Sequence, residues 1–169
     1  MEIIYLSPSL TCSLSVCVYM CDGVHVAGHG DKIAIVDCNF PAYEVATKTT
    51  SGLHIQLANV DLPTAVDAIC SLYPLDYFID SPAQHMSPSP GNELPELAAE
   101  CHNDLKQIIE KHAPGVSVEP LERFAFYEEA RECFAVVQCV GERRPYGNAI
   151  LHKGVVGPDG KDLTPDSLN

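Results

Sequence analysis

Hydrophobic and polar residues are arranged along the chain in a pattern that predicts short buried strands separated by amphipathic helices. Residues 33–36 (IAIV) and 134–140 (FAVVQCV) are continuous apolar runs, which are typical of strands buried on both faces. Residues 96–112 repeat apolar side chains at helical spacing, and Pro114-Gly115 follows them as an end signal. The apolar stripe of this predicted helix comprises Leu97, Cys101, Leu105, Ile108 and Ile109.

Weaker patterns complete the predicted order of elements. Further strands are predicted at 53–59, 116–121 and 149–156, and further helices at 62–72 and 123–132. Residues 81–95 hold four prolines and one glycine, which predicts a loop. The tail at 157–169 is rich in proline, glycine and aspartate, and we expect it to be disordered. The order β-β-α-α-β-α-β-β predicts an α/β fold, a three-layer α/β/α domain with a mixed central sheet.

Length and charge narrow the class of protein and of partner. The chain has 169 residues, of which 46% are hydrophobic, so one folded domain is expected. Its formal net charge of −13 disfavours nucleic acid and anionic membranes as partners, because both require a basic surface.

The first residues of the chain carry an unusual composition. Residues 1–31 contain no Lys or Arg, which disfavours a secretory signal and a mitochondrial transit peptide, and we interpret the stretch as a strand or an arm ahead of the domain. Cysteine and histidine residues gather here at Cys12, Cys17, Cys21, His25 and His29. A zinc site is one interpretation, but the paired C-x-x-C spacing is missing and separately buried thiols are the simpler one.

A histidine and an aspartate mark the two ends of the first predicted strand. His29 stands between two glycines, and Asp37 directly follows residues 33–36. An imidazole exposed by flanking glycines can transfer protons near neutral pH, and a carboxylate at a strand end can bind a hydroxyl. The simpler interpretation is a loop histidine and a carboxylate that caps a turn.

Two further segments place polar groups beside predicted elements. Arg123 lies in the string ERFAFYE, where its guanidinium is either offered to vicinal hydroxyls or held in a surface ion pair. Tyr146, Gly147 and Asn148 precede the last strand, where they offer a phenol, close backbone and an amide, or else form a hairpin turn. Motifs for nucleotide cofactors, phosphate loops, serine hydrolases and zinc proteases are missing from the sequence, so cofactor chemistry has no support.

Taken together, these strings resemble the L-fucose mutarotases. Residues 27–42 (AGHGDKIAIVDCNFPA) are similar to the family's GHGDE-strand-DANFPA segment, and residues 122–155 are similar to its RFAFYERA…FAIV…GE…YGN…LKKGV segment. The run LYPLDYF at 72–78 matches a third family segment. The D-ribose pyranases, a sister family, are less similar around RFAFYE, which favours fucose. Residues 1–26 are atypical, because the Ser-Pro-Glu-Leu-Leu helix start expected just before GHGD is replaced by SPSL further upstream.

The resemblance implies a sugar mutarotase domain at 27–156, of the ribose pyranase/fucose mutarotase type. It implies an isomerase that interconverts the α and β anomers of free L-fucose, without metal or cofactor. It also implies a homo-oligomer, from dimer to decamer, with sites near subunit contacts, and we expect a cytoplasmic protein with free thiols. His29 aligns with the catalytic histidine, and the implied substrate-binding residues are Asp37, Arg123, Tyr146, Gly147 and Asn148. A D-ribose pyranase and a sugar-binding homologue with impaired turnover remain the alternatives.

Overall fold

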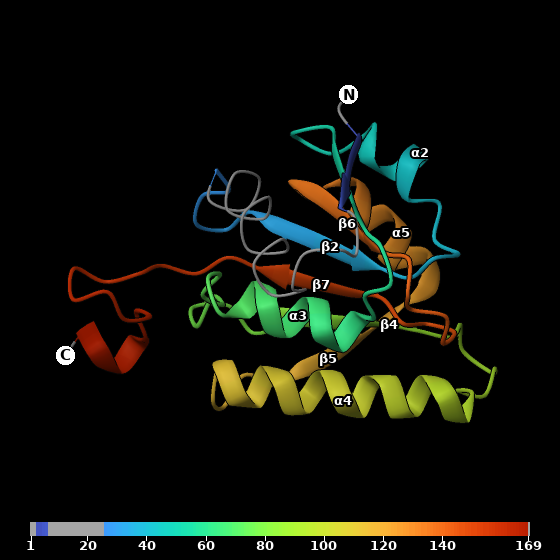
Figure 1. Cartoon of the computed structure of the whole chain (residues 1–169). Coiled ribbons are helices and arrows are strands. Elements are labelled where there is room, and N and C mark those ends of the chain that lie inside the picture. Colours follow the sequence, from blue (N-terminus) through green and yellow to red (C-terminus); the bar gives the residue numbers. More distant parts are fainter. Residues whose placement is uncertain (1–2, 7–25, 169) are drawn as a thin grey trace.

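Seven strands form one mixed sheet in the computed structural model, which describes residues 3–6 and 26–168 (Figure 1). The strands are β1 (Ile3–Leu6), β2 (Lys32–Val36), β3 (Leu53–Leu57), β4 (Ala83–Ser87), β5 (Val118–Glu122), β6 (Ala135–Cys139) and β7 (Ala149–His152). They lie in the order β1-β3-β6-β2-β7-β4-β5, so β2 is the central strand. β7 runs antiparallel to its neighbours β2 and β4, and the other neighbouring pairs are parallel. The predicted mixed sheet is confirmed.

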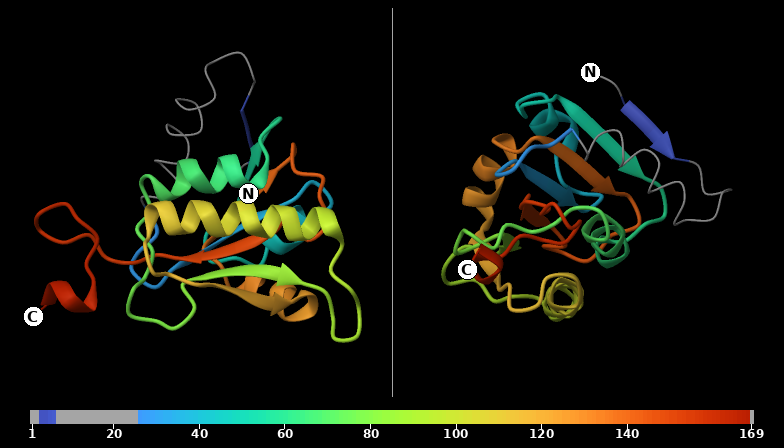
Figure 2. Two further views of the ribbon diagram at one scale, coloured as in Figure 1. Left: turned by 90° about the horizontal axis from the view of Figure 1, so that it is seen from below. Right: turned by 90° about the vertical axis from the view of Figure 1, so that its left-hand side faces the viewer.

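Helices cover both faces of this sheet, as the three-layer prediction requires (Figure 2). The helices are α2 (Ala42–Ala46), α3 (Leu62–Cys70), α4 (Glu96–His112), α5 (Arg123–Arg131) and the short 3₁₀ helix η1 (Pro165–Leu168). α3 and α4 pack on one face, around a core that includes Ile33, Ile35, Leu105 and Ile109. α2 and α5 pack on the other face, around Ala34, Val36 and Phe126. The alternation of side chains along β2 therefore supplies both cores, which is why its sequence is apolar without interruption.

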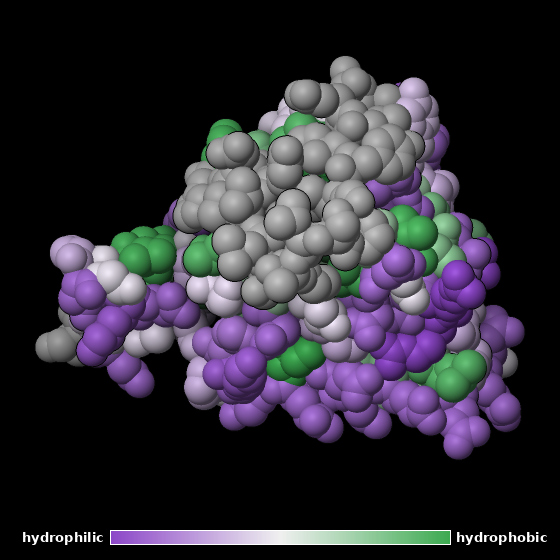
Figure 3. Space-filling model, in the orientation of Figure 1, coloured by the Kyte–Doolittle hydropathy of each residue, from purple (hydrophilic) through white to green (hydrophobic). Residues whose placement is uncertain are grey.

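The long helix α4 has the predicted bounds, but its buried stripe is shifted. Cys101, Leu105 and Ile109 are fully buried, whereas Leu97 is 54% exposed. Ala98 and His102 are buried in its place, so the stripe begins one residue later than the apolar pattern predicts. The visible surface over α4 is mainly hydrophilic with isolated hydrophobic side chains, as expected of an amphipathic helix (Figure 3).

One predicted loop is wrong, and one α-helix was not predicted. β4 lies inside the proline-rich segment 81–95, because the prolines flank its five residues instead of interrupting them. β4 pairs with β5 on one side and with β7 on the other, which satisfies its backbone groups. The helix α2 has only five residues and follows Pro41, so it carries too little periodicity to be read from the sequence.

Both ends of the chain contain local structure. β1 pairs in parallel with β3 at the edge of the sheet, and of the predicted cysteine and histidine cluster only His29 falls within the described residues. The segment that was predicted as a disordered tail extends away from the sheet (Figure 1). It contains a β-bridge between Val156 and Asp162 and the helix η1.

Candidate functional site

A pocket opens where the carboxyl end of β2 meets the loop that precedes β7. Its volume is about 300 Å³. The lining residues are Asp37, Asn39, Phe40, Met86, Arg123, Tyr127, Pro145, Tyr146 and Asn148. Four of the six residues implied by the resemblance, Asp37, Arg123, Tyr146 and Asn148, therefore meet in one cavity although 111 residues separate the first from the last.

Asp37 and Asn148 form a reciprocal pair at the base of this pocket. The backbone N–H of Asp37 donates to Asn148 Oδ1 at 2.9 Å, and Asn148 Nδ2 donates to Asp37 Oδ2 at 2.9 Å. The second carboxylate oxygen of Asp37 accepts from the backbone N–H groups of Asn39 and Phe40. Both side chains are buried, so these bonds fix the carboxylate in one orientation at the cavity wall.

Burial also changes the acidity of this carboxyl. Desolvation raises the pKa of Asp37 above its ordinary value, and this effect outweighs the hydrogen bonds that the carboxylate accepts, which act in the opposite direction. A carboxyl group with a raised pKa in a cavity is well suited to exchange hydrogen bonds with a neutral hydroxyl.

The first turn of α5 forms a second wall. Glu122 caps this helix by accepting from the backbone N–H groups of Phe124 and Ala125, which places Arg123 at the cavity. Tyr127 lies one turn further along the same helix face and stacks on Phe40, with ring centroids 5.2 Å apart. The wall thus combines a guanidinium donor with an aromatic surface.

The loop before β7 adopts an unusual backbone conformation. Tyr146 has φ of 58°, in the left-handed region that non-glycine residues rarely adopt. Its carbonyl oxygen accepts from the backbone N–H of Asn148 at 2.8 Å and lies 3.1 Å from Nε2 of His102. Gly147, which the resemblance implies as a substrate-binding residue, does not line the cavity.

His29 lies away from the pocket of its own chain. It precedes β2 in a turn where Gly30 has φ of 82°, while Asp37 follows the strand, so the strand separates the two by roughly 15 Å or more. His29 is half-exposed, and its Nε2 atom lies 3.1 Å from Oδ2 of the buried Asp76. The other oxygen of Asp76 accepts from the backbone N–H of Phe78, which holds the carboxylate against the imidazole.

Sequence reasoning missed several residues of the pocket and of the histidine turn. Tyr127 could have been found, because it lies four residues after Arg123 on one helix face. Met86 was missed because β4 was predicted as a loop. Asp76 stands in the run LYPLDYF, but nothing in the sequence pairs it with His29.

The site as a whole suits a small, neutral, polyhydroxylated ligand. Its polar groups are a guanidinium, a phenol, an amide and a carboxylate, and an aromatic wall stands beside them. Within residues 3–6 and 26–168, we find no cluster of three or more metal-ligating side chains. In the same part of the chain, no helix combines the length and the apolar character needed to cross a bilayer.

A stacked histidine pair lies beneath the loop that carries Tyr146. The rings of His85 and His102 have centroids 3.8 Å apart, and both side chains are buried. Desolvation, together with the neighbouring His102 and Lys106, lowers the pKa of His85 to about 4, although the bond to the Met86 carbonyl and the charge of Glu119 act in the opposite direction.

We therefore expect the free energy of unfolding to fall as the pH is lowered through this pair's titration range. Between pH 6.5 and about 4 the unfolded chain protonates His85 and the folded chain does not, so the loss reaches about 3 kcal/mol below pH 4. Urea unfolding at a series of pH values measures it. His85→Gln should reduce the dependence, and His112→Gln at the end of α4 should not. Equal slopes for His85→Gln and the unmodified protein would contradict the assignment.

Comparison with known proteins gives a consistent set of matches. A model of the RbsD / FucU transport protein family matches residues 19–156. The fucose mutarotase of Danio rerio is 36% identical over 132 residues, which cover 78% of this chain and 84% of that protein. The fucose mutarotase of Homo sapiens is 35% identical over 129 residues, which cover 76% and 82%.

Solved structures extend these matches to the fold. The fucose mutarotase of Streptococcus pneumoniae, crystallised in complex with L-fucose, is similar with a TM-score of 0.69 and 32% identity, covering 83% of this chain and 94% of that one. RbsD of Bacillus subtilis, complexed with D-ribose, has a TM-score of 0.62 at 18% identity, covering 91% and 100%, and is similar in fold alone.

Proposed function

Because the chain belongs to the RbsD / FucU transport protein family, and its pocket suits a neutral sugar, we propose that it is an L-fucose mutarotase. It interconverts the α and β anomers of free L-fucose. The observation that carries the proposal is the meeting of Asp37, Arg123, Tyr146 and Asn148 in one cavity, together with the similarity to fucose mutarotases over three quarters of the chain.

The reaction requires two proton transfers around one bond cleavage. A base removes the proton of the anomeric hydroxyl, the bond between C1 and the ring oxygen breaks, and the ring oxygen gains a proton. Rotation about C1–C2 then presents the other face of the aldehyde, and the same steps in reverse close the ring. No electron leaves the sugar, so general acid–base groups and hydroxyl binding are sufficient chemistry.

In this proposal the pocket binds the sugar and an imidazole moves the protons. Arg123, Asp37 and Asn148 hold the hydroxyl groups, and the sugar packs beside Tyr127. His29 has the side chain best suited to proton transfer near neutral pH, and Asp76 orients its ring. The ring oxygen needs a second proton carrier, for which the phenol of Tyr146 or a bound water is available.

Because His29 lies at the far end of β2, it reaches a sugar only in a pocket of another copy of the chain. A proton-transfer group must come within hydrogen-bond distance of its substrate, and the strand separates His29 from the pocket of its own chain. We therefore propose a cytoplasmic homo-oligomer in which His29 of one subunit faces the pocket of another.

The test is exchange between L-fucose anomers, measured by saturation-transfer NMR with and without the protein. We expect faster exchange for L-fucose, and a smaller effect on the ring forms of D-ribose. Faster conversion of D-ribose would favour the pyranase activity instead. Calorimetric binding of L-fucose without any acceleration would indicate a sugar-binding homologue and would overturn the enzyme proposal.

A further inference from the structure

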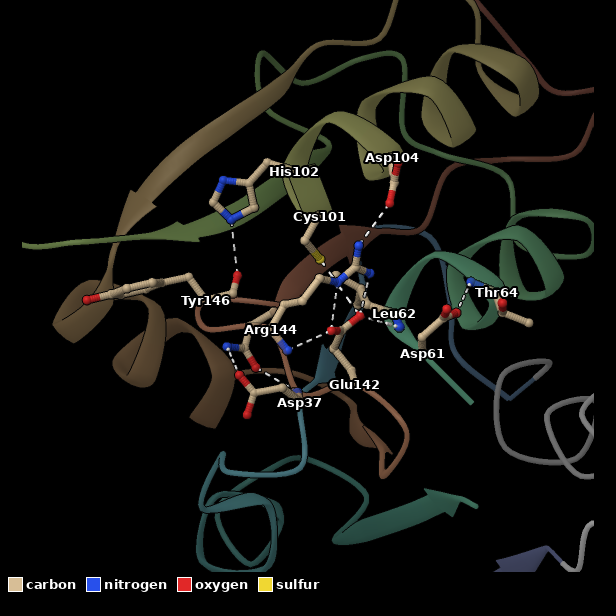
Figure 4. Close-up of polar contacts among 11 residues, drawn as sticks. Asp37, Asp61, Leu62, Thr64, Cys101, His102, Asp104, Glu142, Arg144 and Tyr146 are labelled. Atoms are coloured by element: carbon tan, nitrogen blue, oxygen red, sulfur yellow. Dashed lines mark hydrogen bonds and ion pairs between the residues drawn. The ribbon is translucent and has the colours of Figure 1, made fainter. Parts of the chain in front are cut away.

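A buried carboxylate outside the pocket is connected to the loop that carries Tyr146. Glu142 is only 1% exposed, and it belongs to the segment between β6 and β7. Its Oε1 accepts from the backbone N–H and from Nε of Arg144, both at 2.9 Å. Its Oε2 accepts from the guanidinium of Arg144 at 2.7 Å and from the backbone N–H of Leu62 at 3.1 Å (Figure 4).

This cluster ties the loop to two helices on one face of the sheet. The bond to Leu62 reaches the first residue of α3. Arg144 also donates to Asp104 of α4 at 2.9 Å, and Cys101 of the same helix lies beside the carboxylate (Figure 4). Burial raises the pKa of the Glu142 carboxyl, but the hydrogen bonds from Arg144 and Leu62 outweigh it, so the net pKa lies below the ordinary value. Glu142 is therefore an ionised carboxylate that, together with Arg144, joins the loop to α3 and α4.

The Glu142 side chain packs closely against the Tyr146–Asn148 loop at Gly147. A Cβ atom at that position would lie 2.8 Å from Cγ of Glu142 and 3.1 Å from the carbonyl oxygen of Arg144. The backbone N–H of Gly147 donates to that same carbonyl, at 3.3 Å. The glycine therefore lets the loop close over the Glu142 side chain, and this contact leads directly into Asn148.

We propose that Glu142, clamped by Arg144, is the positioning residue that sets the Tyr146–Asn148 loop for sugar binding. Neither Glu142 nor Arg144 lines the pocket, so the pair acts through the loop and not on the sugar. The left-handed backbone of Tyr146 lies between the clamp and Asn148, and a conformation of this kind persists only where its surroundings hold it. The effect on sugar binding rests on the proposed function, whereas the positioning of the loop by Glu142 does not.

The test replaces Glu142 by glutamine, which keeps the shape of the side chain and removes its charge. Both carboxylate oxygens of Glu142 accept from N–H groups, but glutamine has an NH₂ group in place of one oxygen. The NH₂ group cannot accept a hydrogen bond, so at least one bond from Arg144 or Leu62 is lost. In the sugar-free protein we expect the side-chain amide signals of Asn148 to shift in the ¹⁵N spectrum. We also expect the Kd for L-fucose to rise by about tenfold, the size of effect of one hydrogen bond lost between the displaced Asn148 side chain and the sugar.

Asp67→Asn is the matched control. Asp67 also joins α3 to α4, through Lys111 and His112, but it lies on the surface and away from the loop. It should leave both the Asn148 signals and the Kd unchanged. An equal effect of both substitutions would overturn the proposal, because it would show a general response of the helix layer.

Arg144→Lys keeps the test decisive if Glu142→Gln does not fold. Lysine preserves the positive charge but cannot form the forked contact, so a smaller shift of the Asn148 signals in the same direction is expected. A folded variant of either kind with unchanged Asn148 signals would overturn the proposal. Should the unmodified protein fail to act on L-fucose, the proposed function fails, while the signals of the sugar-free protein still decide the role of Glu142.

Discussion

Replacement of His29 by alanine should slow the exchange of L-fucose anomers by about 10²–10⁴-fold, the contribution that a positioned acid–base group usually makes. The half-exposed imidazole is held by the buried carboxylate of Asp76 and makes no contact with the pocket of its own chain. Because the pocket residues that bind the hydroxyl groups stay intact, its removal should reduce kcat far more than it weakens the binding of L-fucose. NMR exchange measures the first quantity and calorimetry the second.

His112→Ala is the appropriate control for this variant. His112 also pairs with an aspartate, because its Nε2 lies 2.7 Å from Oδ1 of Asp67, but it lies at the end of α4 and outside the site. It should exchange L-fucose anomers at the rate of the unmodified protein. If His29→Ala were equally fast, His29 would have no part in the chemistry.

Sequence reasoning recovered the elements with a long or uninterrupted apolar pattern, and it also recovered the weaker ones. The strands predicted at 53–59, 116–121 and 149–156 became β3, β5 and β7, and the helices predicted at 62–72 and 123–132 became α3 and α5. α4 spans the predicted residues 96–112, and the buried runs at 33–36 and 134–140 became β2 and β6. β4 and α2 were missed for two different reasons. The five residues of α2 are too few for helical periodicity. β4 lies between two prolines and is stabilised by pairing with β5 and β7, which no local pattern reveals.

The candidate site was only partly accessible from the sequence because its geometry depends on topology. Asp37 and Asn148 meet because β7 lies antiparallel beside β2, and this places the start of one strand against the end of the other. The same topology places His29 at the far end of β2. A motif lists these residues together, whereas the fold separates the proposed proton-transfer group from the proposed binding pocket within one chain.

This separation leads to a second prediction with a large effect, recovery of activity in mixed assemblies. Arg123→Ala should raise the KM for L-fucose by about 10- to 100-fold, because hydrogen bonds from a charged group to the sugar are lost. Such a chain still carries an intact His29, and a His29→Ala chain still carries an intact pocket. If the site combines two copies, random mixing leaves about one quarter of the sites complete.

The experiment co-expresses the two variants with different affinity tags and purifies the mixed assembly through both. Its exchange rate should exceed the sum of the two variants measured alone, because each complete site pairs the pocket of a His29→Ala chain with the histidine of an Arg123→Ala chain. A chain that carries both substitutions, mixed with His29→Ala, is the control, since no site there has both groups. A mixed assembly with only the summed rate would mean that no His29 acts across the interface. Because β2 separates His29 from the pocket of its own chain, that outcome would also remove His29 from the proposed chemistry.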